Sequence, residues 1–296
     1  FNMEKGDFLN ENISKIYCIS FRFKCNGGLS SMRQVDNEGG KNESSKADNV
    51  TTITVATDAD TKPFTYSENN QATGYDVEVA RAVFKELPEY KLKVEITDFD
   101  SVVAGVDSGR YQLAANDIGW NKDRAEKYYF SAPLSKSNNA VAVKSDLKVK
   151  TLGDLAGKST EVLPSANFTT ILSKYNDANP DKQVKLNYVD GSYPTASRLA
   201  DVDSGKIDFL LYDAISLKTI IKDKGLDTLK VNNIESESTD PHDGFEYFLY
   251  TKDEKGKELQ TKVDKVLKKL QSNGTLKELS EKYFGGDFVP SADAYK

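Results

Sequence analysis

The sequence predicts an α/β protein built of two lobes with a ligand cleft between them. Segments with strand and helix patterns alternate from Thr52 onward, with short connections. The alternation begins again after Lys144, which indicates a second unit of the same kind. Strands that take turns with helices are typical of βαβ units around a parallel sheet. The length of 296 residues agrees with about two domains.

The first unit opens with a strand over residues 52–57, in which Ile53 and Val55 share one face. A helix is expected over residues 74–87, because apolar residues recur there at helical spacing and Pro88 follows. Residues 91–97 alternate between polar and apolar and predict a strand. A short helix over 101–109 and a strand over 111–116 complete this unit.

The second unit starts with a strand at residues 140–144 and a short capped helix at 151–157. Three further strands are expected, at 159–163, 184–189 and 206–213. The helices between and after them cover residues 167–175, 193–204 and 214–224. A strand at 245–251 precedes two C-terminal helices. The first of these carries an apolar face made of Leu259, Val263, Val266, Leu267 and Leu270.

Composition excludes several function classes. The net charge of −6 leaves no basic footprint for nucleic acid. No apolar run approaches the roughly 20 residues that span a bilayer. His242 is the single histidine, which excludes His-rich zinc sites and mechanisms that need two histidines. It lies far from any Gly-flanked serine, so no Ser-His-Asp or Cys-His set can be assembled. We therefore expect no catalytic residues, no metal site and no cofactor.

The first 51 residues are expected to be a leader and flexible tether. Residues 27–49 are rich in Gly, Ser, Asn and charge, and cannot bury enough surface to offset their ordering entropy. Both cysteines, Cys18 and Cys25, fall in this part, and the cysteine-free remainder fits an extracytoplasmic protein. Residues 1–24 lack a signal-peptide pattern and are native or an added expression leader. Lipid attachment at Cys25 stays an open alternative.

Polar residues follow several predicted strands, where open α/β sheets bind ligands. Asp58 and Asp60 come after the first strand, and Arg124 ends the loop after the strand at 111–116. Asp213 ends the strand at 206–213 and begins a helix. An arginine on one lobe and an aspartate on the other suit a zwitterion, since guanidinium binds carboxylate bidentately. The alternative is that both are ordinary solvated ion-pairing residues.

Six segments give the chain a resemblance to a known family. They are TITVATDADTKPFTY, GYDVEVARAVFKEL, DFDSVVAGVDSGRYQLAANDIGWNKDRAEKYYFSAPL, TLGDLAGKSTEVL, DSGKIDFLLYDA and LKKLQSNGTLKELSEKYFGG. In this order they resemble the amino-acid-binding proteins of ABC importers, solute-binding protein family 3. The likeness runs from Thr52 to Gly286, and the parts around Arg124 and Asp213 look closest to the cystine-binding branch.

The resemblance implies a type II periplasmic-binding-protein fold. Each of the two lobes would hold a mixed, mostly parallel sheet flanked by helices, and two crossings would join them. Lobe 1 would take residues 52–141 and 245–296, and lobe 2 residues 142–244. PHDG around His242 is expected to mark the second crossing.

The resemblance also implies roles for residues that would hold the ligand head group. Arg124 would clamp the α-carboxylate, and Gly119 would donate a backbone N–H to the same group. Asp213 would pair with the α-ammonium, and the Asp117 carbonyl would accept from it while its side chain faces the ligand. The N–H groups of Ala166 and Asn167 would also meet the carboxylate.

The ligand side chain would meet another set of residues. Asp58 would reach it, and Phe99 would form a wall against it. Thr61 stands where the family often has a second aromatic, so the aromatic sandwich is incomplete. Tyr212 is a further candidate for the pocket. Trp120 is expected to pack into the core, with pocket lining as the alternative.

The predicted function is an extracytoplasmic receptor that captures a free amino acid and delivers it to a membrane permease by hinge closure. Cystine is favoured, and other polar amino acids stay open. The protein is expected to be a monomer at the cell surface or in the periplasm, possessing or lacking a lipid anchor. The alternatives are a cyclohexadienyl dehydratase-like enzyme with Asp58 or Asp213 as general acid, and a surface sensing or adhesion protein.

Overall fold

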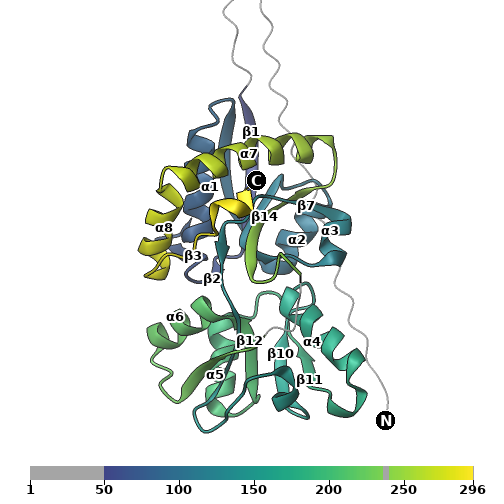
Figure 1. Ribbon diagram of the computed structural model, residues 1–296. Coiled ribbons are helices and arrows are strands. Elements are labelled where there is room, and N and C mark those ends of the chain that lie inside the picture. The colour runs from purple at the N-terminus through teal and green to yellow at the C-terminus, as the bar shows by residue number, and fades with distance from the viewer. Residues whose placement is uncertain (1–49, 236–239, 296) are drawn as a thin grey trace, which may run out of the picture. The chain divides into compact units, whose positions relative to one another are not determined.

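A computed structural model describes residues 50–235 and 240–295 of the chain. The two cysteines, the question of lipid attachment and the predicted leader and tether up to residue 49 lie outside these residues. Thr51, predicted as the end of the tether, is already part of the first strand. Within the described part, strands and helices form two groups (Figure 1). The N-terminal strands and the C-terminal helices share one group, whereas the middle of the chain forms the other. We call the group around the large sheet, residues 50–136 and 245–295, lobe 1, and residues 139–234 lobe 2.

Lobe 1 is built on a six-stranded sheet with the order β5-β1-β6-β14-β7 and with β8 also paired to β14. The strands β1, β5 and β6 run parallel, and β14 runs antiparallel to β6, β7 and β8. Its strands are β1 (Thr51–Thr57), β5 (Tyr90–Ile96), β6 (Leu113–Gly119), β7 (Tyr128–Phe130), β8 (Ser135–Lys136) and β14 (Phe245–Thr251). A small antiparallel sheet adds β2 (Asp60–Thr61), β3 (Thr65–Glu68) and β4 (Gln71–Thr73).

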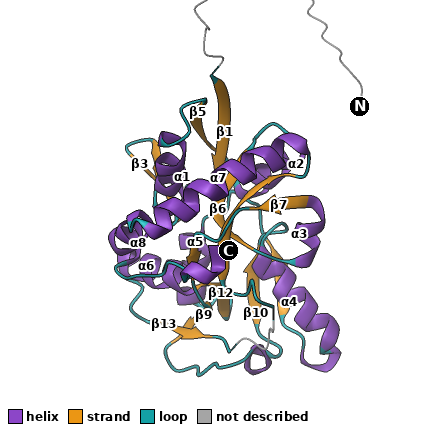
Figure 2. Ribbon diagram, turned by 45° about the horizontal axis from the view of Figure 1, so that its top comes forward, coloured by secondary structure: helices purple, strands orange, loops and turns teal. Residues whose placement is uncertain are grey.

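Helices cover both faces of the large sheet (Figure 2). One face packs on α1 (Tyr75–Lys85), α7 (Glu254–Ser272) and α8 (Thr275–Phe284), and the chain ends in the 3-10 helix η3 (Ala292–Tyr295). The other face packs on α2 (Phe99–Asp107), near the short helix α3 (Lys122–Lys127). All five residues of the apolar face predicted for α7 are buried. Burial of such a stripe against the sheet is the main source of stability for a helix of this kind.

Lobe 2 contains a three-stranded antiparallel sheet and a separate parallel pair. The sheet has the order β12-β9-β13, and the pair is β10-β11. The strands are β9 (Asn139–Lys144), β10 (Ser159–Val162), β11 (Lys185–Tyr188), β12 (Phe209–Asp213) and β13 (Leu229–Asn233). The helices are η1 (Leu152–Leu155), α4 (Asn167–Ala178), η2 (Pro180–Lys182), α5 (Thr195–Ser204) and α6 (Ala214–Lys224), with η denoting 3-10 helices.

The α/β class and the mixed sheets flanked by helices are confirmed, but parallel pairs do not dominate in lobe 2. Its central strand β9 pairs antiparallel with both neighbours. This strand follows directly from lobe 1, so no βα crossover within lobe 2 sets its direction. Two connections run next to each other here, since the Ser137 amide donates to the Gly244 carbonyl at 2.8 Å. The predicted lobe boundaries at 141 and 245 stay a prediction.

Local sequence explains several element ends that position the binding site. The Asn121 side chain accepts from the Arg124 amide at 2.8 Å and begins α3. Asp213 begins α6 in the same way. Gly205 ends α5 with φ of 81°, a left-handed conformation that glycine adopts without steric cost. These short signals fix where Arg124 and Asp213 stand at the edge of their lobes.

No helix in the described part of the chain is both long and apolar enough to cross a membrane.

Candidate functional site

A cavity of about 760 Å³ lies between the two lobes and gathers most of the predicted site residues. The predicted residues that line it are Asp58, Phe99, Asp117, Gly119, Arg124, Ala166, Asn167, Tyr212 and Asp213. Thr61 does not line it and instead contacts Tyr212 across the lobes, with 3.0 Å between the two hydroxyl oxygens. The volume falls in the range of small-molecule sites.

Arg124 supplies a buried positive charge on the lobe 1 side. Its residue is 9% exposed, and its guanidinium donates to the carbonyls of Gly119 at 2.9 Å and Ser165 at 2.7 Å. None of the ion pairs among residues 50–235 and 240–295 includes this arginine. Desolvation lowers the pKa of Arg124 to about 10, where it is still protonated at neutral pH. The Arg124 guanidinium can therefore form an ion pair with an anionic group of a ligand.

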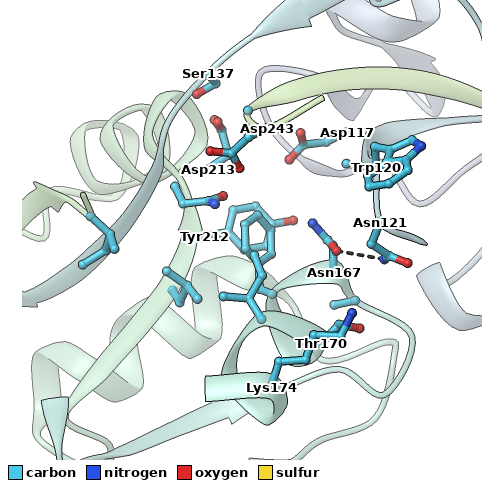
Figure 3. Close-up of a pocket in the computed structure, with 18 of the residues that line it drawn as sticks. Asp117, Trp120, Asn121, Ser137, Asn167, Thr170, Lys174, Tyr212, Asp213 and Asp243 are labelled. Atoms are coloured by element: carbon cyan, nitrogen blue, oxygen red, sulfur yellow. Dashed lines mark hydrogen bonds between the residues drawn. The ribbon is translucent and has the colours of Figure 1, made fainter. Parts of the chain in front are cut away.

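Asp213 supplies a buried carboxylate on the lobe 2 side. Its Oδ1 accepts from the amides of Ile215 at 2.8 Å and Ser216 at 2.9 Å, which caps α6. Burial raises the pKa of Asp213 to about 6, and the hydrogen bonds that it accepts act in the opposite direction. The cap fixes the carboxyl group at the cavity wall, where Figure 3 shows it on the same side as Asp117.

Further carboxyl groups gather around Asp117. Asp117 has φ of 49°, an unusual conformation for a residue other than glycine, and its amide donates to Asp76 Oδ2 at 2.7 Å. The carboxyl group of Glu246 lies close enough to that of Asp117 for the two to affect each other's pKa, and it accepts from the Ser135 hydroxyl. Burial raises the pKa of both Asp117 and Glu246 well above the ordinary range, and the nearby carboxyl groups add to this effect. Burial likewise raises the pKa of Asp76 to about 7.

Asp58 has a different surrounding from the other acids. Its Oδ1 accepts from the Asp60 amide and the Thr65 hydroxyl, both at 2.9 Å. Its Oδ2 accepts from Thr61 at 3.1 Å and from Asn116 Nδ2 at 2.9 Å. Four protein donors therefore hold the loop between β1 and β3 through this carboxylate. The predicted contact of Asp58 with a ligand side chain stays a prediction.

The start of α4 faces lobe 1 at the cavity. Asn167 Oδ1 accepts from Asn121 Nδ2 at 2.9 Å (Figure 3). A Cβ on Gly119 would stand 2.9 Å from Asn167 Nδ2, so a larger residue here would displace the Asn167 side chain. The Ala166 amide donates to the Leu163 carbonyl at 3.1 Å, and its predicted contact with a ligand carboxylate stays a prediction. The N–H roles of Gly119 and Asn167 stay predictions.

Aromatic side chains line the cavity differently from the expectation. Phe99 is 8% exposed and belongs to the apolar core of lobe 1 while touching the cavity. Trp120 was expected in the core, but it is half-buried, lines the cavity and stacks on His242 with 4.7 Å between ring centroids. The expectation was wrong because the stacking partner comes from a segment some 120 residues away, which a local sequence pattern cannot reveal. His242 Nδ1 is in turn 2.9 Å from the Tyr247 hydroxyl.

Sequence reasoning missed several residues at the cavity. Glu246 and Asn116 lie within predicted strands, and Arg198 lies within the predicted helix at 193–204, but none of the three was singled out as a site residue. Each was a charged or amide residue at a position whose neighbours are buried, which is the signal that could have found it. Among the described residues, no cluster of three or more His, Cys, Asp or Glu side chains is arranged to hold a metal ion.

Comparison with known proteins places the whole folded part in one family. Residues 53–286 match the family model described as bacterial extracellular solute-binding proteins, family 3. The chain is 31% identical to the probable amino-acid-binding protein YxeM of Bacillus subtilis over 85% of this chain and 90% of that protein. It is 32% identical to the L-cystine-binding protein TcyA of the same organism, over 79% and 82% of the two chains.

Solved structures agree with this match. One, from a study of glutathione import in Gram-positive bacteria via GshT and the cystine ABC importer TcyBC of Streptococcus mutans, is 40% identical. It has a TM-score of 0.77 over 82% of this chain and 99% of that chain. A putative L-cystine ABC transporter protein from Listeria monocytogenes is 28% identical, with a TM-score of 0.70 over 81% and 99%.

These matches decide between the predicted function classes. The family description and the names of the relatives refer to binding proteins, which confirms the prediction of a binding protein and does not favour the enzyme or the sensing and adhesion alternatives. The family description also confirms the predicted location outside the cytoplasm. The chain belongs to the bacterial extracellular solute-binding proteins of family 3.

Proposed function

We propose that this protein captures the amino-acid head group of a solute in the cavity between its lobes and delivers the solute to an ABC importer. The observation that carries the proposal is the pair Arg124 and Asp213. One is a buried cation and the other a buried carboxylate, they come from different lobes, and both line one cavity. A zwitterion satisfies both charges at once, and burying a charged ligand is tolerable only when each charge finds a partner.

The proposed contacts divide the head group between the two charges. Arg124 binds the α-carboxylate, helped by the N–H groups of Gly119 and of Asn167 at the start of α4. Asp213 binds the α-ammonium, and the carboxyl oxygens of Asp117 and Glu246 are further acceptors on the lobe 1 side. The unusual backbone of Asp117 fits this role, because strained residues gather at binding sites.

Closure of the lobes on the ligand is the proposed mechanism. Hydrogen bonds that span the lobes include Thr61 to Tyr212, the Thr195 amide to Asp60 at 2.7 Å, and Asn121 to Asn167. Arg124 to the Ser165 carbonyl and Lys62 to Asp223 also join the two lobes. These contacts require the closed arrangement, and so does simultaneous contact of a ligand with Arg124 and Asp213. Ligand binding therefore shifts an open–closed equilibrium toward the form that a permease recognises.

Cystine is the favoured ligand, and glutathione is the second candidate. Two relatives are named as cystine proteins, and the 40% identical structure comes from a study of glutathione import that also names a cystine importer. Other polar amino acids stay open. We further propose a monomeric receptor, anchored at the cell surface or free outside the cell.

A thermal-shift screen tests the proposal. The purified protein is heated with each of the twenty amino acids, with cystine and with reduced glutathione. A ligand that binds only the native state raises the melting temperature by mass action. We expect a shift of several degrees with cystine or glutathione at saturating concentration. No shift with any of these compounds, checked by calorimetry, would overturn the proposed function.

A further inference from the structure

The cavity contains a second buried arginine, contributed by the other lobe. Arg198 lies in α5 of lobe 2, lines the same cavity as Arg124 and is 3% exposed. Arginine is rarely buried to this degree without a charged partner. The two lobes thus each place one guanidinium in the space between them.

The contacts of Arg198 within the protein are few. One terminal nitrogen donates to the Thr195 hydroxyl at 2.8 Å, and the guanidinium carbon stands 5.6 Å from the centroid of the Tyr212 ring. Its Nε has no hydrogen-bond partner in the described part of the chain. No carboxylate among residues 50–235 and 240–295 stands within ion-pair distance of it. The acid that faces it is Asp60 of lobe 1, whose Oδ2 already accepts from the Thr195 amide.

We propose that Arg198 binds a second carboxylate of the ligand, so that the protein selects amino-acid derivatives that carry two carboxylates. The proposal rests on the proposed function, in which Arg124 and Asp213 hold the amino-acid head group. The unpartnered Nε, together with a terminal nitrogen, forms the side of a guanidinium that binds carboxylates bidentately. The face of Tyr212 holds the guanidinium plane in position.

Cystine and glutathione share this chemistry. Cystine carries a carboxylate at each end, and glutathione carries one on its glutamyl and one on its glycyl residue. They differ near the second carboxylate, because only cystine has an ammonium group there. Asp60 lines the cavity beside Arg198 and would hold that second ammonium. Asp60 therefore separates the two ligands, whereas Arg198 serves both.

Calorimetry with paired ligands tests the proposal. The pairs are glutathione with its glycyl monoethyl ester, and cystine with S-methylcysteine, so the second member of each pair lacks the second carboxylate. We expect wild-type protein to prefer the first member of the pair that it binds by at least tenfold. Arg198→Gln should reduce this preference by about tenfold, whereas the matched variant Arg110→Gln, on an exposed side chain outside the cavity, should retain it.

Each other outcome has a defined meaning. Equal affinity of wild-type protein for both members of a pair overturns the proposal even if Arg198→Gln does not fold. An equal loss for both members in Arg198→Gln also overturns it, and indicates that this arginine acts on lobe closure through Asp60. If wild-type protein binds none of the four compounds, the proposed function itself fails. Loss of cystine binding with retained glutathione binding in Asp60→Asn assigns the second head group of cystine to this end.

Discussion

Asp60 of lobe 1 caps a helix of lobe 2. Its Oδ2 accepts a hydrogen bond of 2.7 Å from the Thr195 amide at the first residue of α5, where no side chain of lobe 2 provides a cap. An open helix end is satisfied by such an acceptor, and the helix dipole favours a negative charge there. The helix is therefore complete only when the lobes are closed.

Removal of the Asp60 carboxylate should favour the open form. We expect Asp60→Ala to weaken ligand binding by roughly tenfold, because a charge-assisted hydrogen bond that exists only in the closed form is lost. The melting temperature without ligand should change little. Calorimetry gives the affinity, and X-ray scattering gives the radius of gyration of the free protein.

An exposed contact between the lobes provides the control. Lys62 and Asp223 form an ion pair of 2.5 Å whose side chains are 42% and 40% exposed. Solvent-exposed pairs contribute little. Asp223→Ala should therefore change the affinity by less than about threefold, and a larger loss there than in Asp60→Ala would contradict this ranking.

Removal of Arg124 should abolish ligand binding. Truncating one partner of a buried charge pair costs about 2–5 kcal/mol, so Arg124→Ala should weaken binding by at least about thirtyfold. Circular dichroism should show an intact fold, since the lost contacts are hydrogen bonds to two carbonyls. Arg110→Ala serves as the control, and wild-type affinity in Arg124→Ala would contradict the assignment.

The two roles of Asp213 can be separated by two substitutions. Asn retains an oxygen that caps α6, whereas Ala removes it. We expect Asp213→Asn to lose ligand binding at near wild-type stability, and Asp213→Ala to lose about 1 kcal/mol of unfolding free energy as well. Urea unfolding and calorimetry measure the two effects. An Asp213→Asn protein that binds ligand as tightly as wild type would rule out the ammonium contact.

The buried carboxyl of Asp76 should make stability depend on pH. Its pKa is about 7 in the folded protein against an ordinary value of 3.8, so the folded state binds more protons between these values. The contribution of Asp76 to the free energy of unfolding is then fully present below pH 3.8 and is lost as the pH rises toward 7. The stability of Asp76→Asn relative to wild type should rise between pH 4.5 and pH 7.5 by at least about 1 kcal/mol. A difference that is constant with pH, by urea unfolding, would refute this.

Ligand affinity should depend on pH in the opposite direction. Asp213 has a pKa of about 6 and must be ionised to hold an ammonium group. The free site is mostly protonated at pH 5 and mostly ionised at pH 7, so the affinity should rise about tenfold over this interval. Calorimetry in buffers of different ionisation enthalpy should show proton release at pH 5.5. Affinity that falls over the same interval would exclude this role.

The sequence was informative wherever local signals determine structure. The apolar stripe of α7 and the position of Asp213 between a strand and a helix follow from patterns within about twenty residues. By contrast, α3 has six residues and no apolar periodicity, and β13 has five residues with few apolar ones. Whether such short elements form depends on packing against segments that are distant in the sequence. A local hydrophobic pattern therefore does not predict them.

The candidate site shows the same division. Asp213 stands at the end of β12, and Arg124 lies in the segment that follows β6, and topology marks both places as ligand positions. Glu246 reaches the site because β14 pairs with β6 and sets it opposite Gly119, a residue 127 positions earlier in the chain. Trp120 turns to the cavity because His242 stacks on it. Both facts depend on long-range pairing that periodicity cannot specify.

The position of β14 has a consequence for how the chain is made. This strand pairs with β6, β7 and β8, so the sheet of lobe 1 has all its strands only after Thr251 has emerged. Lobe 2 takes its strands from Asn139 to Asn233 without interruption. During synthesis or export from the N-terminal end, lobe 2 can therefore complete its sheets first. The sheet formed by β1, β5 and β6 lacks β14 until the C-terminal part of the chain has emerged.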